Sequence, residues 1–133
     1  MTAQAIRDTA NQCILPVLLG NTGRAHRIAA RVFRHFGVLS LICGTPRLLD
    51  LADFSSVTLR MPKTEHERLT VDTLIDFAEQ YPEPLLLLVP CSASAAAVVA
   101  HHKEVLESYF MLSDGESIFT SSPLTDFEKN AKP

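Results

Sequence analysis

The chain has 133 residues, of which 47% are hydrophobic and 20% are charged. This composition is typical of one compact α/β domain and excludes a disordered chain. At 133 residues, the sequence is expected to form a single domain. The formal net charge of −3 gives no indication of a nucleic-acid-binding or membrane-surface protein.

The cysteines and the N-terminal segment indicate a cytoplasmic protein. Cys13, Cys43 and Cys91 are widely spaced and form no Cys-x-x-Cys pair, so we expect reduced thiols. Residues 1–11 lack the apolar core that a signal peptide needs, and no apolar run reaches membrane-spanning length. We therefore expect a cytoplasmic location and no membrane contact.

The opening elements are predicted as a strand followed by a helix. Residues 14–19 form an apolar run without polar alternation, which is typical of a strand buried on both faces of a parallel sheet. Pro16 cannot donate a hydrogen bond, so we expect good pairing only after it. Gly37 follows the helix in the position of a left-handed cap. The apolar stripe of this helix comprises Ala25, Ile28, Ala29, Val32, Phe33 and Phe36.

Strands and helices alternate along the rest of the chain. Further strands are predicted at residues 38–43, 57–61 (an edge strand closed by Pro62), 85–89 and 110–112. Helical segments are predicted at residues 47–52, 69–81, 93–100 and 104–109. This alternation predicts a three-layer Rossmann-like α/β domain with a mostly parallel sheet of about five strands. The predicted organisation is an N-terminal arm or short helix (1–12), the α/β domain (13–113) and a C-terminal tail (114–133).

Any ligand is expected beyond the carboxyl ends of the strands, at residues 20–24, 43–47, 61–63 and 90–94. Gly20 and Gly23 permit positive φ and close approach of a ligand, and the start of the following helix attracts anions. Only Gly-x-x-Gly remains of the dinucleotide fingerprint, because Thr22 and Ala25 replace two of its positions. An anion site and a tight turn without a ligand therefore both remain open. Arg24, in the first helical turn, is better tolerated beside an anion.

No complete catalytic or metal set is predicted. Adjacent His101 and His102 should point to different faces of a helix, without a third ligand at suitable spacing. Ser92 lacks a Gly-x-Ser-x-Gly elbow, so a helix N-cap is its expected role. A short polar turn explains Asp50 and Asp53. There is no Walker lysine motif and no acidic cluster for magnesium. His35 and His66 are expected to face solvent.

Four segments resemble the N-terminal domain of ATP-grasp carboxylate–amine ligases, closest to the branch of D-aspartate ligase and carbamoyl-phosphate synthetase. They are LLGNTGRAHRIAA (18–30), GVLSLICG (37–44), LADFSSV (51–57) and LLLVPCSASA (86–95). The resemblance covers residues 16–112 and implies a pre-ATP-grasp domain that packs on the catalytic part and helps to form the substrate site. It also implies that ATP and magnesium bind to later domains absent from these 133 residues, so that the chain alone is not catalytic.

The resemblance also implies which residues bind ligand. The residues that match the first and fourth turns of the family are Gly20, Asn21, Thr22, Gly23, Arg24, Pro90, Cys91 and Ser92. Ala93 and Ser94 stand where family members often have acidic residues. The implied partners are ATP-grasp catalytic domains, on the same or a separate chain, and a small carboxylate or amino-acid substrate, with a homodimer possible. The tail is expected to lead toward the ATP-binding part, and its end at residues 132–133 to be a truncation.

Two other functions are alternatives to the ligase domain. The first is a stand-alone regulatory module that binds a small ligand or nucleotide through the turn at residues 20–23. The second is an NAD-dependent enzyme. The missing third glycine disfavours that enzyme, as does the absence of an acidic residue directly after the second strand, where Cys43, Gly44 and Thr45 stand.

Overall fold

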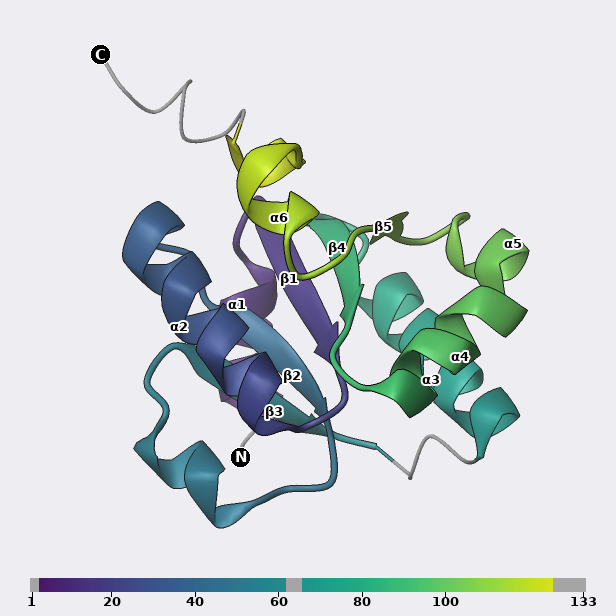
Figure 1. Cartoon of the computed structure of the whole chain (residues 1–133), viewed down its shortest axis with the longest axis horizontal. Coiled ribbons are helices and arrows are strands. Elements are labelled where there is room, and N and C mark those ends of the chain that lie inside the picture. The colour runs from purple at the N-terminus through teal and green to yellow at the C-terminus, as the bar shows by residue number, and fades with distance from the viewer. Residues whose placement is uncertain (1–2, 62–65, 126–133) are drawn as a thin grey trace.

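The computed structural model describes residues 3–61 and 66–125 of the chain. Its strands are β1 (Ile14–Leu19), β2 (Ser40–Gly44), β3 (Ser56–Arg60), β4 (Leu85–Pro90) and β5 (Met111–Leu112). Its helices are α1 (Ala3–Ala10), α2 (Gly23–Phe36), the 3₁₀ helix η1 (Leu48–Ala52), α3 (Glu67–Gln80), α4 (Ala93–His101), α5 (Lys103–Leu106) and α6 (Ser117–Thr120) (Figure 1). The strand closure predicted at Pro62, most of the loop at 61–63 and the end of the tail lie outside the described residues.

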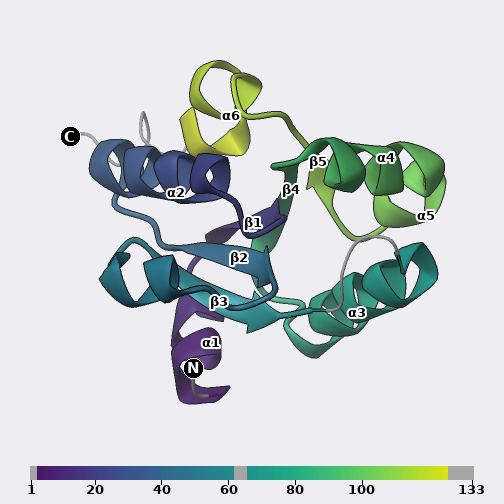
Figure 2. The same ribbon diagram turned by 60° about the horizontal axis from the view of Figure 1, so that its bottom comes forward.

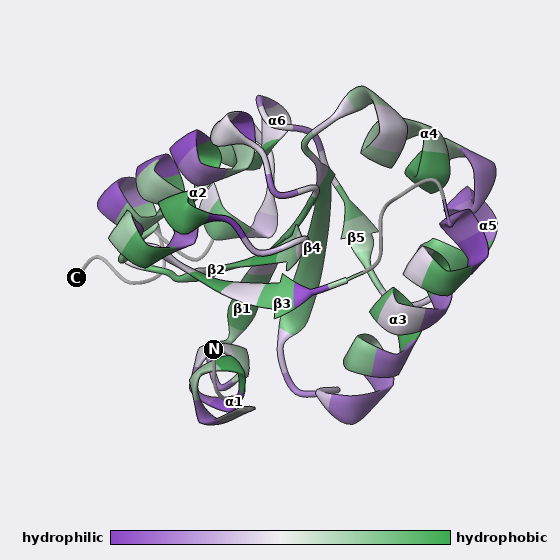
Figure 3. Cartoon of the chain, turned by 90° about the horizontal axis from the view of Figure 1, so that it is seen from below, coloured by the Kyte–Doolittle hydropathy of each residue, from purple (hydrophilic) through white to green (hydrophobic). Residues whose placement is uncertain are grey.

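The protein has a three-layer Rossmann-like α/β fold. One sheet has the strand order β3-β2-β1-β4-β5, and every neighbouring pair is parallel, where the sequence predicted a mostly parallel sheet. α2 and α6 pack on one face of the sheet, and α1, α3, α4 and α5 pack on the other (Figure 2). The strands are apolar, and the hydrophilic residues gather on the outer sides of the helices (Figure 3).

β1 is the central strand, and all six of its residues are buried, as expected for a strand covered on both faces. The expectation that pairing begins only after Pro16 is correct on one side alone. Pairing with β2 begins at Val17, but pairing with β4 already begins at Ile14. The Gly20 N–H donates to the Cys43 carbonyl of β2. Because every second residue of a strand has the same orientation, the Pro16 nitrogen also faces β2. There the Gln12 amide donates to the Leu39 carbonyl at 2.8 Å, in place of the N–H that Pro16 lacks.

α2 differs from the predicted helix in one respect. Gly37 ends it in the left-handed conformation, with φ of 69°, as predicted. Phe33, however, was expected on the buried stripe and is 45% exposed, whereas His26 is only 8% exposed. The buried side of α2 thus includes the polar residue His26, near the start of the helix. The segment around η1 covers His26 and provides two carboxylates that contact its ring. Among the described residues, no helix has the length and apolar character needed to cross a bilayer.

Candidate functional site

The predicted binding residues come together where β1 and β4 end. The chain runs from β1 outward to β2 and β3 and then returns across the sheet to β4, so the direction of winding reverses between β1 and β4. In open α/β sheets, ligands bind at such a reversal. We call residues 20–24 and 90–92 the switch-point turns. All eight residues predicted to bind ligand lie in these two turns.

Direct contacts hold the two switch-point turns against each other. Thr22 Oγ1 donates to the Cys91 carbonyl at 3.1 Å, and the Cys91 N–H donates to Leu19 at 2.8 Å. The Cys91 side chain is buried, and this burial raises the pKa of its thiol to about 11. Cys91 is therefore a packing residue and is not a thiolate at neutral pH.

Two helix N-termini meet at these turns. Thr22 caps α2 by accepting from the Ala25 N–H at 3.2 Å, and Ser92 caps α4 by accepting from the Ala95 N–H at 3.1 Å. The predicted capping role of Ser92 is confirmed. The first turn of an α-helix also contains N–H groups without an intrahelical acceptor, and its dipole favours negative charge. The arrangement therefore offers two adjacent anion-attracting helix ends.

Arg24 adds a positive charge beside these helix ends. It is exposed, and its guanidinium lies so close to Gly115 that a Cβ on that glycine would come within 2.8 Å of Nη2. Hydrogen bonds from the N–H groups of Ser117 and Glu116 lower the pKa of Asp114, and the charge of Arg24 contributes to this shift. Arg24 thus lies between the first switch-point turn and the segment that follows β5.

The two glycines of the first turn have different roles. Gly20 has φ of +107°, and a Cβ there would lie 3.3 Å from Ser92 Oγ, whereas Gly23 has no positive φ and is the first residue of α2. We expect Gly20→Ala to destabilise the fold by about 1–3 kcal/mol through backbone strain. Gly23→Ala is the matched control and should cost nothing or stabilise slightly. Urea unfolding of both variants measures the difference, and equal stabilities would contradict these roles.

His26, which the sequence analysis did not single out, is the centre of a buried polar network. Its Nδ1 contacts Asp53 Oδ2, and its Nε2 lies 3.0 Å from Asp50 Oδ1 and 2.9 Å from Asn21 Oδ1. The Asn21 amide donates to both Asp50 oxygens, at 3.0 and 3.1 Å, and to the Thr45 carbonyl at 2.9 Å. The Asn21 side chain is therefore committed to the loop after β2. The network fastens this loop to α2.

The two carboxylates of this network are held in the ionised form. Burial alone would raise the pKa of Asp50, but hydrogen bonds from the Arg47 N–H and Asn21, together with the nearby Thr58 hydroxyl and the charge of His26, outweigh it and lower that pKa. For Asp53, burial is likewise outweighed by hydrogen bonds from Ser55, His26 and Ser56, so its pKa is also lowered. The polar-turn interpretation of Asp50 and Asp53 missed their shared partner. The available signal was their three-residue spacing in a stretch with no other acid.

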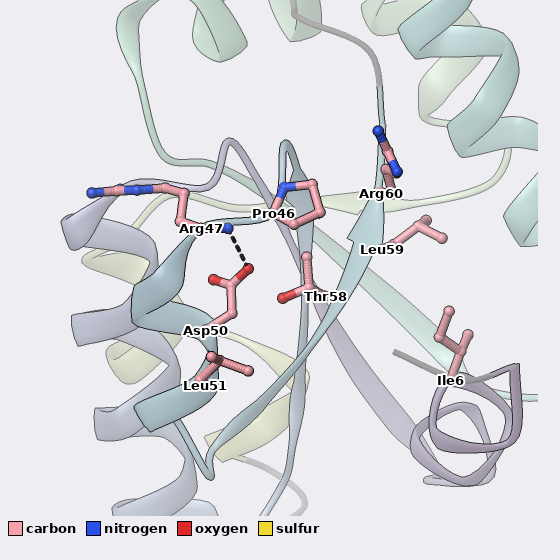
Figure 4. Close-up of a pocket in the computed structure, with 8 residues that line it drawn as sticks. All are labelled: Ile6, Pro46, Arg47, Asp50, Leu51, Thr58, Leu59 and Arg60. Atoms are coloured by element: carbon pink, nitrogen blue, oxygen red, sulfur yellow. Dashed lines mark hydrogen bonds between the residues drawn. The ribbon is translucent and has the colours of Figure 1, made fainter.

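A pocket of about 490 Å³ opens beside this network, at the ends of β2 and β3. Its apolar walls are Ile6, Pro46, Leu51 and Leu59. Figure 4 shows Arg60 at its rim, the Arg47 side chain pointing away, and the Thr58 hydroxyl directed toward Asp50. Thr58 is 5% exposed, and its Oγ1 faces Asp50 but forms no well-aligned hydrogen bond. The pocket is thus largely apolar, with one unsatisfied buried hydroxyl.

His101 and His102 do not diverge as expected. Nδ1 of His101 and Nε2 of His102 approach the same Glu67 carboxylate, at 3.1 and 3.2 Å. The hydrogen bond from His101 is the main cause of the lowered pKa of Glu67, and this contact joins α4 to the start of α3. His35 and His66 are exposed, as predicted. Within residues 3–61 and 66–125, no group of three or more His, Cys, Asp or Glu side chains is placed to hold a metal ion.

Comparison of the chain with models of known protein families, with curated proteins and with solved structures found no match. The interpretation of the site therefore depends on its own geometry. That geometry consists of two helix N-termini and Arg24 at the switch-point turns, a buried His26 network beside them, and an apolar pocket at the ends of β2 and β3.

Proposed function

We propose that this chain is the substrate-side, pre-ATP-grasp-type domain of an ATP-dependent carboxylate–amine ligase. In this proposal the chain holds a small carboxylate or amino-acid substrate at the switch-point turns. ATP and magnesium bind to ATP-grasp catalytic domains, which lie on the same or another chain. The chain therefore supplies binding and orientation, and the ligation step itself requires those domains.

The observation that carries the proposal is the meeting of the α2 and α4 N-termini beside Arg24. A carboxylate placed there receives attraction from two helix ends, each worth about 0.3–1 kcal/mol at an exposed position. The Arg24 guanidinium can in addition donate two parallel hydrogen bonds to one carboxylate. The fold supports the same interpretation, because the reversal of winding between β1 and β4 is the usual ligand position in such sheets.

The surroundings of the first turn favour a small anion over a dinucleotide. In the Rossmann pattern, an acidic residue after the second strand binds the ribose hydroxyls. Asp50 is the nearest candidate in this chain, but its oxygens accept from Asn21, from the Arg47 N–H and from His26. Its side chain is only 8% exposed. A ribose would have to displace these partners.

Calorimetric titration of the chain with a panel of amino acids and small carboxylates tests the proposal. We expect saturable binding of at least one of them, weakened about tenfold in Arg24→Gln, which corresponds to about 1.4 kcal/mol. Arg34→Gln, in the last turn of the same helix, is the matched control and should bind as the wild type does. Equal affinity of the wild type and Arg24→Gln, or no binding by the panel, would contradict the proposal.

A stand-alone small-ligand module is the second candidate function, and the 490 Å³ pocket is the observation that favours it. An apolar ligand would pack against the walls of this pocket. One hydrogen-bond acceptor on that ligand would give the Thr58 hydroxyl a partner. If such a ligand bound while Arg24→Gln had no effect, the pocket would be the functional site in place of the switch-point turns.

A further inference from the structure

The segment around η1 presents large apolar side chains to solvent. Leu48, Leu51 and Phe54 are 87%, 81% and 88% exposed. Leu49, also in η1, is 41% exposed, and Phe33 of α2, 45% exposed, lines the same groove as Phe54. We call these five residues the η1 patch. Single exposed apolar residues are ordinary, but this many in one short segment and the helix beside it are typical of an interaction surface.

The η1 patch is held in place by buried contacts. Asp50 and Asp53, which alternate with the exposed residues, both turn inward to His26, and Asp53 also accepts from Ser56 at 2.8 Å. The Arg47 guanidinium donates to the Asn21 carbonyl at 3.1 Å. The segment therefore exposes its leucines and phenylalanine from a fixed backbone, and a partner that binds them has little ordering cost to overcome.

A groove of about 320 Å³ lies between α2 and residues 52–55 of the segment around η1. Phe33, Phe54 and the two alanines Ala30 and Ala52 give it apolar walls. Its polar lining residues are Arg34, Ser55 and Asp53, and the Asp53 carboxylate is turned to His26, Ser55 and Ser56. Figure 2 shows the segment between β2 and β3 beside α2, at the edge of the sheet. The groove is large enough for one inserted apolar side chain, next to a positive charge.

The charged side chains beside the patch differ in exposure. Arg34 lines the groove and Arg47 directly precedes Leu48, and the acidic residues of the same segment are Asp50 and Asp53. Both aspartates are covered, with side chains 8% and 9% exposed, whereas Arg34 and Arg47 are exposed. The exposed charges next to the groove and at the start of η1 are therefore those of arginines.

We propose that the η1 patch binds an acidic segment of a partner protein, which inserts an apolar side chain into the groove beside Arg34. Charge complementarity selects the acidic partner. It disfavours a second copy of this chain on the same patch, because arginines would then face arginines. A concave groove also suits an anchoring side chain better than a lipid surface. The proposal is independent of the ligase function, since it involves neither Arg24 nor the switch-point turns.

Selection of a random linear peptide library against the folded chain tests this proposal. We expect the enriched peptides to combine aspartate or glutamate with one large apolar residue. Their binding should weaken about tenfold or more in Phe54→Ser and in Arg34→Glu, and should also weaken with added salt. Val105→Ser on α5, an apolar residue 41% exposed on another part of the surface, is the matched control and should bind as the wild type does.

Several results would overturn the proposal. They are failure to enrich any peptide, enrichment of neutral or basic peptides, or equal loss of binding in Val105→Ser. Concentration-dependent self-association that Phe54→Ser abolishes would assign the patch to a second copy. Binding to vesicles of anionic lipid that both variants abolish, without peptide binding, would assign it to a membrane.

Discussion

Replacing Leu87 with aspartate is expected to prevent the domain from folding. Leu87 is fully buried in β4, where Pro16 of β1 and Met111 of β5 are its register partners. The substitution removes a buried leucine, which costs about 2–5 kcal/mol, and adds the several kcal/mol needed to bury an unpaired carboxylate. These losses are comparable to the whole stability of a small domain, about 5–15 kcal/mol. Circular dichroism and urea unfolding at neutral pH measure the effect.

Leu85→Asp provides the control for this prediction. Leu85 begins the same strand but is 41% exposed, so its aspartate can remain hydrated and the protein should stay folded. A Leu87→Asp protein with a cooperative transition near that of the wild type would mean that β4 is not an interior strand of the sheet.

Replacing His26 with leucine should have the second-largest effect on stability. The imidazole lies between two nearly buried carboxylates, and each of its ring nitrogens is beside a carboxylate oxygen. Leucine leaves Asp50 and Asp53 facing an apolar side chain, and removal of one partner from a buried charged network costs about 3–5 kcal/mol. Urea unfolding should show this loss, whereas His35→Leu, at an exposed position of the same helix, should change stability by less than about 0.5 kcal/mol.

Acid provides an independent measurement of the His26 network. The pKa values of Asp50 and Asp53 lie below the ordinary value of 3.8 in the folded protein. Their contribution to stability is therefore present above pH 3.8 and is lost as the pH falls through the lowered values. Because His26 is among the causes of both shifts, His26→Leu should show a shallower loss of stability below that pH. Identical acid profiles of wild type and variant would contradict the role of His26 as the link between the two carboxylates.

The sheet could be predicted from the sequence because its signals are local. Unbroken apolar runs such as residues 14–19 and 85–89 are typical of strands buried on both faces, and Gly37 ends its helix by its own backbone freedom. The same locality explains the successful prediction of Ser92 as a helix cap. In each case the deciding interaction lies within a few residues of the pattern.

The His26 network could not be predicted in this way, because Asp50 and Asp53 lie 24 and 27 residues after His26 in the sequence. Helical periodicity places Phe33 on the apolar side of α2, but periodicity does not include the segment that packs beside that helix. Once the carboxylates of Asp50 and Asp53 lie against α2, the buried position goes to the residue that can donate to them. The exposed η1 patch was missed for the same reason, since exposure depends on which neighbours the fold supplies.

The most direct test of the ligase-domain proposal is an NMR titration of the folded chain with three separate additions. These are ATP with magnesium, NAD, and the amino acids and small carboxylates of the calorimetric panel. The account predicts that a carboxylate or amino acid shifts the amide signals of Gly23, Arg24 and Ala93 saturably, and that neither nucleotide does so. A ligand at about 100 times its Kd should also raise the unfolding free energy by about 2.7 kcal/mol. Saturable binding of ATP or NAD at those amides would contradict the account and make the chain a nucleotide-binding module.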